Sequence, residues 1–172
     1  MMKGPTMSDA RFEDGAERPL RLIARGPDDL QVMSALVQDG VLTGADLRFN
    51  RARGRFSMLI NRFRWEDREQ AAAANRRFER VRSVLDFADV RAVRHQGLVR
   101  DADTVLSLLS VSFEPEDASE AAPADPAGPG QVILTFAGDG VLALSVECLE
   151  VELSDVTRPY VAPSGHAPAH SE

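Results

Sequence analysis

Apolar residues recur at helical spacing in one clear segment near the start of the chain. Leu30, Met33 and Val37 lie three to four residues apart, and they follow the sequence Gly-Pro-Asp-Asp at 26–29. This spacing predicts an amphipathic helix. Proline suits the first helical position, acidic residues suit the positive N-terminal end, and Gly40 is placed to stop the helix.

Most other apolar residues alternate with polar ones, which predicts β-strands rather than helices. The stretches with this pattern are 20–24, 47–49, 55–65, 81–87, 90–98, 105–113, 132–136 and 141–153. Arg-Ala-Arg-Gly at 51–54 and Ala-Gly-Asp-Gly at 137–140 predict turns between neighbouring strands. In the last stretch the apolar parity changes near Cys148, so a bulge or bend is expected there.

These elements predict an α+β fold with a mainly antiparallel sheet of seven or eight strands and one amphipathic helix near the N-terminus. Residues 56–63 resemble residues 106–113, which favours either two similar meanders or a barrel-like arrangement; a chance likeness between alternating strands explains it equally well. The Ala-rich stretch 66–77 is expected to add a short exposed connecting helix.

The organisation predicted along the chain is one domain over residues 18–160, flanked by disordered tails at 1–17 and 161–172. Both tails lack apolar periodicity. The internal segment 115–130 is rich in Pro, Ala and acidic residues, so it is expected to form a mobile acidic loop between two strands.

Composition narrows the cellular setting. The chain has no apolar run near the ~18 residues of a membrane helix, and its start lacks the apolar stretch of a secretory signal. A single cysteine, Cys148, excludes an intrachain disulfide and fits a reducing cytoplasm. Its apolar neighbours predict that Cys148 is a small buried hydrophobe.

Charge is distributed unevenly along the chain. Fourteen arginines and six acidic residues lie between Arg48 and Arg100, although the whole chain carries a net charge of −7. Such a concentration of arginine predicts a basic face that meets an anionic partner. The alternative is that the preference for Arg over Lys reflects a GC-rich genome.

Five residues of this arginine-rich stretch form the candidate binding patch. If residues 55–65 make a central strand, Arg62, Arg64 and Trp65 lie at its solvent-exposed end, and Arg80 and Arg82 share one face of the next strand. Arginine beside aromatic rings can hold a phosphate and stack on bases. The competing interpretation is that these arginines pair with the chain's own acidic residues or lie over the rim of the core.

Signals for catalysis are weak. His95 is interpreted as an exposed strand histidine, while His166 and His170 fall in the C-terminal tail. The sequence contains no GxSxG, GxGxxG or GxxxxGK[ST] motif and no Cys/His cluster with metal-ligand spacing. We therefore expect no cofactor and no metal, and no catalytic residue is assigned.

Several segments between about residues 18 and 160 carry a family resemblance: Phe-Ser-Met-Leu-Ile-Asn-Arg-Phe-Arg-Trp-Glu at 56–66, residues 80–87, and Val-Glu-Cys-Leu-Glu at 146–150. These segments resemble the DUF2948 family of alphaproteobacterial proteins. The resemblance implies a small domain without assigned catalytic residues.

Three functions remain open from the sequence. The first is a non-catalytic protein-interaction module with an arginine-rich rim, whose partner is another protein or a second copy. The second is an RNA- or nucleotide-phosphate-binding domain that uses the same patch. The third is an enzyme whose site surrounds His95.

Overall fold

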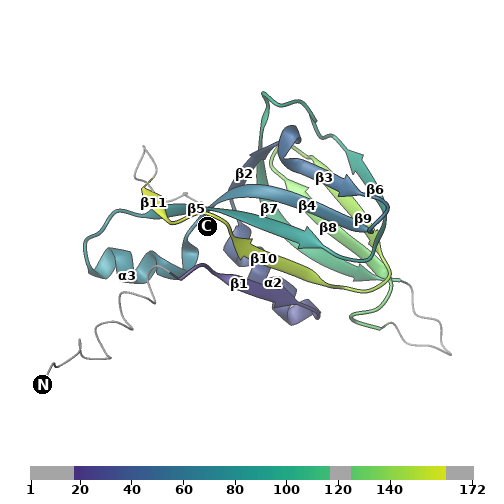
Figure 1. Ribbon diagram of the computed structural model, residues 1–172, viewed down its shortest axis with the longest axis horizontal. Coiled ribbons are helices and arrows are strands. Elements are labelled where there is room, and N and C mark those ends of the chain that lie inside the picture. Colours follow the sequence, from purple (N-terminus) through teal and green to yellow (C-terminus); the bar gives the residue numbers. More distant parts are fainter. Residues whose placement is uncertain (1–17, 117–124, 162–172) are drawn as a thin grey trace, which may run out of the picture.

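The computed structural model describes residues 18–116 and 125–161 (Figure 1). The chain forms one large antiparallel sheet with two α-helices and two short 3-10 helices. In chain order the elements are β1 (Arg21–Ala24), α2 (Pro27–Val37), β2 (Gly40–Thr43), η1 (Gly44–Asp46), β3 (Leu47–Asn50), β4 (Arg55–Phe63), η2 (Trp65–Asp67), α3 (Arg68–Ala73), β5 (Glu79–Phe87), β6 (Val90–Gln96), β7 (Val105–Pro115), β8 (Gly130–Phe136), β9 (Val141–Val146), β10 (Val151–Asp155) and β11 (Tyr160–Val161).

The sheet has eleven strands, more than the sequence predicts, and it is open rather than a closed barrel. Its main order is β1-β10-β5-β4-β2-β7-β8-β9-β6, and β3 and β11 pair with β4 and β5 off this path. The strands β2 and β11 have four and two residues, too short to show a clear alternation. The stretch 141–153 is divided between β9 and β10 by a bend at 147–150, which confirms the predicted break near Cys148.

The predicted pair of meanders is only half present. Strands β7, β8 and β9 form a continuous antiparallel meander. The β4–β5 hairpin, however, is continued by β10, because β6 crosses the molecule to pair with β9. A hydrophobic pattern fixes the faces of a strand but not its neighbours, so this crossing could not be read from the chain.

Helix α2 forms where the apolar spacing predicts it, although β1 precedes it and it is therefore not an N-terminal element. Leu30, Met33 and Val37 are buried. The helix ends before Gly40, which is the first residue of β2; Asp39, with φ of 63°, makes the turn instead. Figure 1 shows α2 beside β1 and behind β10, and the Val111 N–H of β7 donates to Ser34 Oγ at 2.9 Å.

The core lies on the inner face of the curved sheet. Along β4, Phe56, Met58 and Ile60 point inward and are at most 3% exposed, while Ser57 and Leu59 on the outer face are half-buried. Neighbouring strands continue this division, and their inward residues belong to the same core cluster as α2. The prediction that β4 is a central strand is confirmed, since it lies between β5 and β2.

The acidic segment 115–130 connects β7 to β8, as predicted. Its two ends lie side by side: Pro115 pairs with Gly130, and the Glu116 N–H donates to Pro129 O at 2.9 Å. The middle of this segment, 117–124, and the predicted tails at 1–17 and 162–172 lie outside the described residues. Within the described ranges, no helix is long and apolar enough to cross a membrane.

Candidate functional site

Arg62 does not reach solvent; it is the centre of a buried ion network. Its side chain is 0% exposed, and Nη1 and Nη2 each donate to a Glu66 carboxylate oxygen at 2.9 Å. Nη2 also donates to Asp155 Oδ1 at 3.0 Å, and Nε donates to Ser83 Oγ at 3.0 Å. Burial lowers the pKa of Arg62, but its hydrogen bonds and charge interactions with Glu66 and Asp155 outweigh that effect and raise it.

Arg64 and Trp65 are also held by the protein itself. Arg64 is 7% exposed, and its Nη1 lies 2.6 Å from Glu79 Oε2. The Trp65 Nε1–H donates to Gln38 O at 3.0 Å, and its ring packs edge-on against Phe63 at 4.7 Å between centroids. The prediction that Arg62 and Arg64 lie at a solvent-exposed end of β4 is therefore wrong, because Glu66, Glu79 and Asp155 pair with their buried side chains, while Trp65 is only partly exposed.

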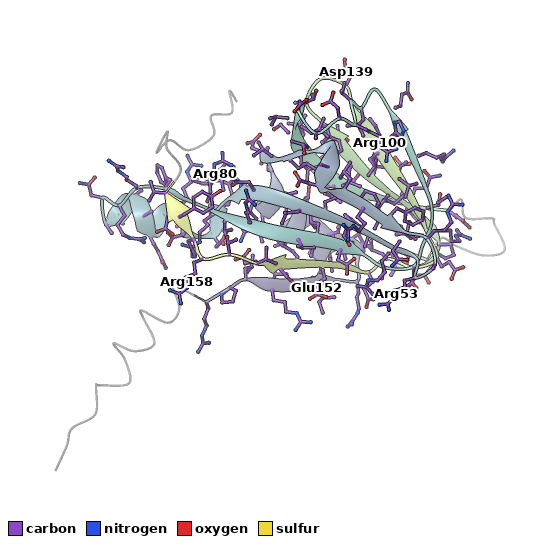
Figure 2. The ribbon with its side chains drawn as sticks, turned by 45° about the horizontal axis from the view of Figure 1, so that its top comes forward. Arg53, Arg80, Arg100, Asp139, Glu152 and Arg158 are labelled. Carbon is purple, nitrogen blue, oxygen red and sulfur yellow. The ribbon has the colours of Figure 1, made fainter. Side chains whose placement is uncertain are left out.

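Arg80 and Arg82 are the two candidate residues that lie outward on β5. Arg82 is exposed, and Arg80 is partly exposed with its Nη1 at 3.5 Å from Asn61 O. Neither forms an ion pair with a carboxylate among the described residues. Figure 2 shows Arg80 and Arg158 toward the end of the molecule where β11 pairs with β5. The five-residue patch is thus reduced to this pair.

Beside Arg82 the sheet has a break between two strands. Strand β4 pairs with β3 only as far as Met58, through Leu47, and with β2 only at Asn61, through Val41. In the described sheet, Leu59 and Ile60 therefore have no partner in β2 or β3. The 3-10 helix η1 carries the chain across this break from β2 to β3.

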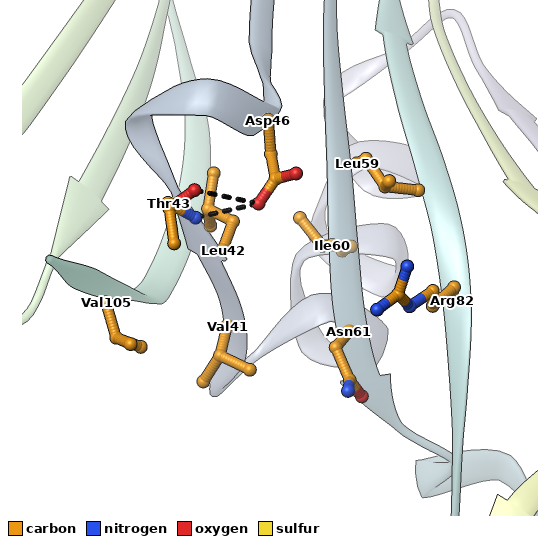
Figure 3. Close-up of a pocket in the computed structure, with 9 residues that line it drawn as sticks. All are labelled: Val41, Leu42, Thr43, Asp46, Leu59, Ile60, Asn61, Arg82 and Val105. Atoms are coloured by element: carbon orange, nitrogen blue, oxygen red, sulfur yellow. Dashed lines mark hydrogen bonds between the residues drawn. The ribbon is translucent and has the colours of Figure 1, made fainter. Parts of the chain in front are cut away.

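This break forms a notch of about 210 Å³ in the outer face (Figure 3). We call it the β2–β4 notch, and its lining residues are Val41, Leu42, Thr43, Asp46, Leu59, Ile60, Asn61, Arg82 and Val105. The buried side chains of Leu42 and Ile60 form its apolar floor.

The polar side chains of the notch differ in whether their hydrogen-bonding groups have partners within the protein. The Asp46 carboxylate accepts bonds from the Thr43 N–H at 2.9 Å and the Thr43 hydroxyl at 3.3 Å, so it caps η1. Asn61 Nδ2 bonds to the Tyr160 hydroxyl, while its Oδ1 is buried without a hydrogen-bond partner among the described residues. Arg82 brings the positive charge. The notch thus combines an apolar floor with the exposed guanidinium of Arg82, while the Asn61 amide oxygen beside them is buried.

A row of side chains in register connects the notch to the rest of the outer face. Ser107 lies opposite Val41, Val41 opposite Asn61, and Asn61 opposite Arg82, so one row crosses β7, β2, β4 and β5. Val105 stands next to this row and is 66% exposed. Arginine is enriched at protein–protein interfaces, and here Arg82 lies in the same notch lining as Val41 and Val105.

Cys148 is not in a strand and is not buried; it is exposed in the bend between β9 and β10. The expectation of a small buried hydrophobe is wrong because β9 ends at Val146, two residues before Cys148, close to where the apolar parity changes. His95 is exposed on β6, as predicted. Among the described residues, no group of three His, Cys, Asp or Glu side chains has the geometry of a metal site.

The family model described as a protein of unknown function (DUF2948) matches residues 20–170. The chain belongs to the DUF2948 family. Neither the curated proteins nor the solved structures include a match to this chain. The candidate site of this DUF2948 protein is therefore argued from its geometry.

Sequence reasoning located Arg82 but missed the rest of the notch. Asn61, Val41 and Val105 carry no motif, and β2 was not recognised as a strand. One signal was available: Asn61 is a polar residue directly after the apolar run Met-Leu-Ile at 58–60. Its role as a notch residue becomes visible only when β2 is placed next to β4.

Proposed function

We propose that this DUF2948 protein is a non-catalytic protein-interaction module, and that the β2–β4 notch receives an apolar side chain flanked by a carboxylate from the partner protein. The observation that supports this most is the exposed Arg82, which has no ion-pair partner among the described residues, beside a notch floored by Leu42 and Ile60. Most binding energy at protein interfaces comes from a few anchors in such pockets.

The chemistry of the notch defines the anchor. Its floor favours a branched apolar side chain, and the planar guanidinium of Arg82 favours a carboxylate that accepts two parallel hydrogen bonds. Val105 extends the apolar contact beyond the notch.

Site-specific photo-crosslinking tests this proposal. A photoreactive amino acid at position 105 should crosslink the protein, in cells of its source organism, to one partner or to a second copy. Arg82→Glu should reduce this crosslinking roughly tenfold or more, since it removes a charged hydrogen bond and adds repulsion. Arg77→Glu, an exposed arginine outside the notch, is the matched control. Equal crosslinking in both variants would contradict the proposal.

The alternative is RNA or nucleotide-phosphate binding by Arg80 and Arg82, because both point outward from one strand without a carboxylate partner in the described structure. Affinity for RNA should then fall steeply with salt concentration. Filter retention of labelled single-stranded RNA at low ionic strength decides this. Retention that Arg80→Ala and Arg82→Ala remove would favour the alternative, and retention unaffected by both would exclude these arginines as its site.

A further inference from the structure

A second hollow lies between two edge strands of the curved sheet, β3 and β6. Strand β3 pairs only with β4, and β6 only with β9, so each has one free edge within the described sheet. Figure 1 shows these two strands side by side. At one end they are joined, because the Val90 N–H donates to Gly54 O at 2.8 Å.

The other end of this hollow is closed by the connection from β6 to β7. Its residue Arg100 packs against Gly44, so closely that a side chain at Gly44 would meet the Arg100 carbonyl carbon at 2.4 Å. This contact fixes Arg100 at the edge of the hollow. We call the hollow the β3–β6 slot; its lining residues are Leu47, Arg48, Phe49, Arg51, Phe56, Val93, His95, Arg100 and Leu142.

The inner wall of the β3–β6 slot is apolar. Phe56 and Leu142 are core residues, 3% and 2% exposed, and Phe49, Leu47 and Val93 are partly buried against the core. The slot has a volume of about 210 Å³. An apolar cavity of roughly 150 Å³ is enough to hold benzene, so the slot has room for one ring or a short branched chain.

The rim of the slot is cationic. Arg48, Arg51 and Arg100 line it with His95, and no acidic residue does. The Arg51 guanidinium lies over the Phe49 ring at 5.7 Å from its centroid. None of the three arginines forms an ion pair with a carboxylate in the described part of the chain.

These three arginines differ from five others in the arginine-rich stretch, which have acidic partners. Arg55, Arg62, Arg64, Arg76 and Arg91 all pair with acidic residues. In a chain with net charge −7, three unpaired arginines around one apolar hollow produce a local positive potential. Low-dielectric walls focus such a field and raise the local concentration of anions.

We infer that the β3–β6 slot is a binding site for a small oxyanion, a phosphate monoester or carboxylate, joined to one apolar ring or short chain. The apolar part lies against Phe49, Phe56 and Leu142. The oxyanion lies at the rim, where guanidinium groups donate paired hydrogen bonds to it. This site lies on other elements than the β2–β4 notch and does not depend on the function proposed for the notch.

Isothermal titration calorimetry with four probes tests the inference on the full chain. Phenyl phosphate combines both features, benzoate carries a single charge, inorganic phosphate lacks the ring and benzyl alcohol lacks the charge. Phenyl phosphate should bind roughly tenfold or more tightly than inorganic phosphate, and benzyl alcohol should bind weakest. Whether benzoate or phenyl phosphate binds better distinguishes a carboxylate ligand from a phosphate ligand.

The variants locate the binding. Arg51→Ala and Arg100→Ala should each weaken phenyl phosphate binding roughly tenfold, the scale of one lost charge-assisted hydrogen bond. Arg53→Ala, in the same turn as Arg51 but outside the slot lining, should leave it unchanged. Because the side chains of Arg51, Arg53 and Arg100 are exposed, each variant should keep the fold. Urea unfolding of each variant checks this.

Three results would overturn the inference. The first is no heat of binding for phenyl phosphate or benzoate at millimolar concentrations. The second is equal affinity for phenyl phosphate and inorganic phosphate, which would leave the apolar wall without a role. The third is unchanged affinity in the Arg51→Ala Arg100→Ala double variant, which would place binding elsewhere.

Discussion

Cys148 shows how its immediate neighbours decide the chemistry of one residue. Its thiol donates a hydrogen bond to Asp89 Oδ2 at 2.9 Å. That hydrogen bond, followed by partial burial and the negative charges of Asp89, Glu150 and Glu147, raises the pKa of Cys148 to about 11. An exposed thiol in this setting is almost entirely protonated at neutral pH and is a poor nucleophile.

Asp89→Asn should activate this thiol. The change removes the carboxylate that raises the pKa of Cys148, and asparagine tolerates the positive φ of 54° at this position. The rate of alkylation by iodoacetamide at pH 7.5 should rise roughly tenfold or more, because the thiolate is the reacting species.

Glu147→Gln is the matched control for this change. It removes a more weakly acting charge and keeps the hydrogen bond to Asp89, so it should accelerate alkylation much less. The loss of free thiol with time gives both rates. Identical rates in the wild type and Asp89→Asn would show that Asp89 does not control this cysteine.

At the scale of elements, the ion network of Arg62 joins strands that are distant in sequence. Arg62 belongs to β4, Ser83 to β5 and Asp155 to the end of β10. Asp155 accepts hydrogen bonds from Arg62 and from the Ser83 hydroxyl at 2.6 Å, and its Oδ2 accepts the Leu20 N–H at 2.9 Å. One buried carboxylate thus holds the chain just before β1 to the central hairpin.

Arg62→Met should strongly destabilise the protein. Methionine keeps the apolar volume but leaves the Asp155 carboxylate, whose side chain is 5% exposed, without its cation. Removing one partner of a buried ion pair costs about 3–5 kcal/mol of unfolding free energy. Urea denaturation followed by circular dichroism measures the loss.

Arg55→Met provides the comparison on the same strand. Arg55 pairs with Asp86 at the surface, where the two side chains are 44% and 23% exposed. A surface pair contributes about 0–1 kcal/mol, so this variant should unfold at nearly the wild-type urea concentration. Similar losses in both variants would mean that the buried network contributes no more than a surface pair.

At the scale of the whole molecule, two distant parts of the curved sheet meet at the hydrogen bond from the Val90 N–H to Gly54 O. Gly54 has a φ of 61°, and a Cβ there would lie 3.2 Å from Val90 O. The backbone conformation and the close approach both favour glycine. This contact holds the β3–β4 turn against the start of β6.

Gly54→Ala should therefore cost more stability than Gly138→Ala. Gly138 also has a positive φ, 83°, but a Cβ at that position would have no neighbour within 4 Å. Both variants carry backbone strain on the order of 1 kcal/mol, and only Gly54→Ala also disturbs the contact with Val90. Thermal unfolding of the two variants compares these costs. A larger loss for Gly138→Ala would show that the contact is unimportant.

Local signals in the chain predicted much of the fold. The spacing of Leu30, Met33 and Val37 located α2, and alternation located the longer strands, because both depend on neighbours in sequence. The short strands β2 and β11 and the crossing of β6 to β9 were missed. Each depends on partners that no local pattern specifies.

The sequence by itself determined that the protein is a mainly antiparallel α+β domain of the DUF2948 family with a stretch rich in arginine. The tertiary structure decided what each arginine does. Arg62 and Arg64 are buried because Asp155, Glu66 and Glu79 meet them there, while Arg82, Arg51 and Arg100 stay unpaired beside apolar hollows. The sequence determines which residues are charged, but the packing of distant segments determines which partners those residues have.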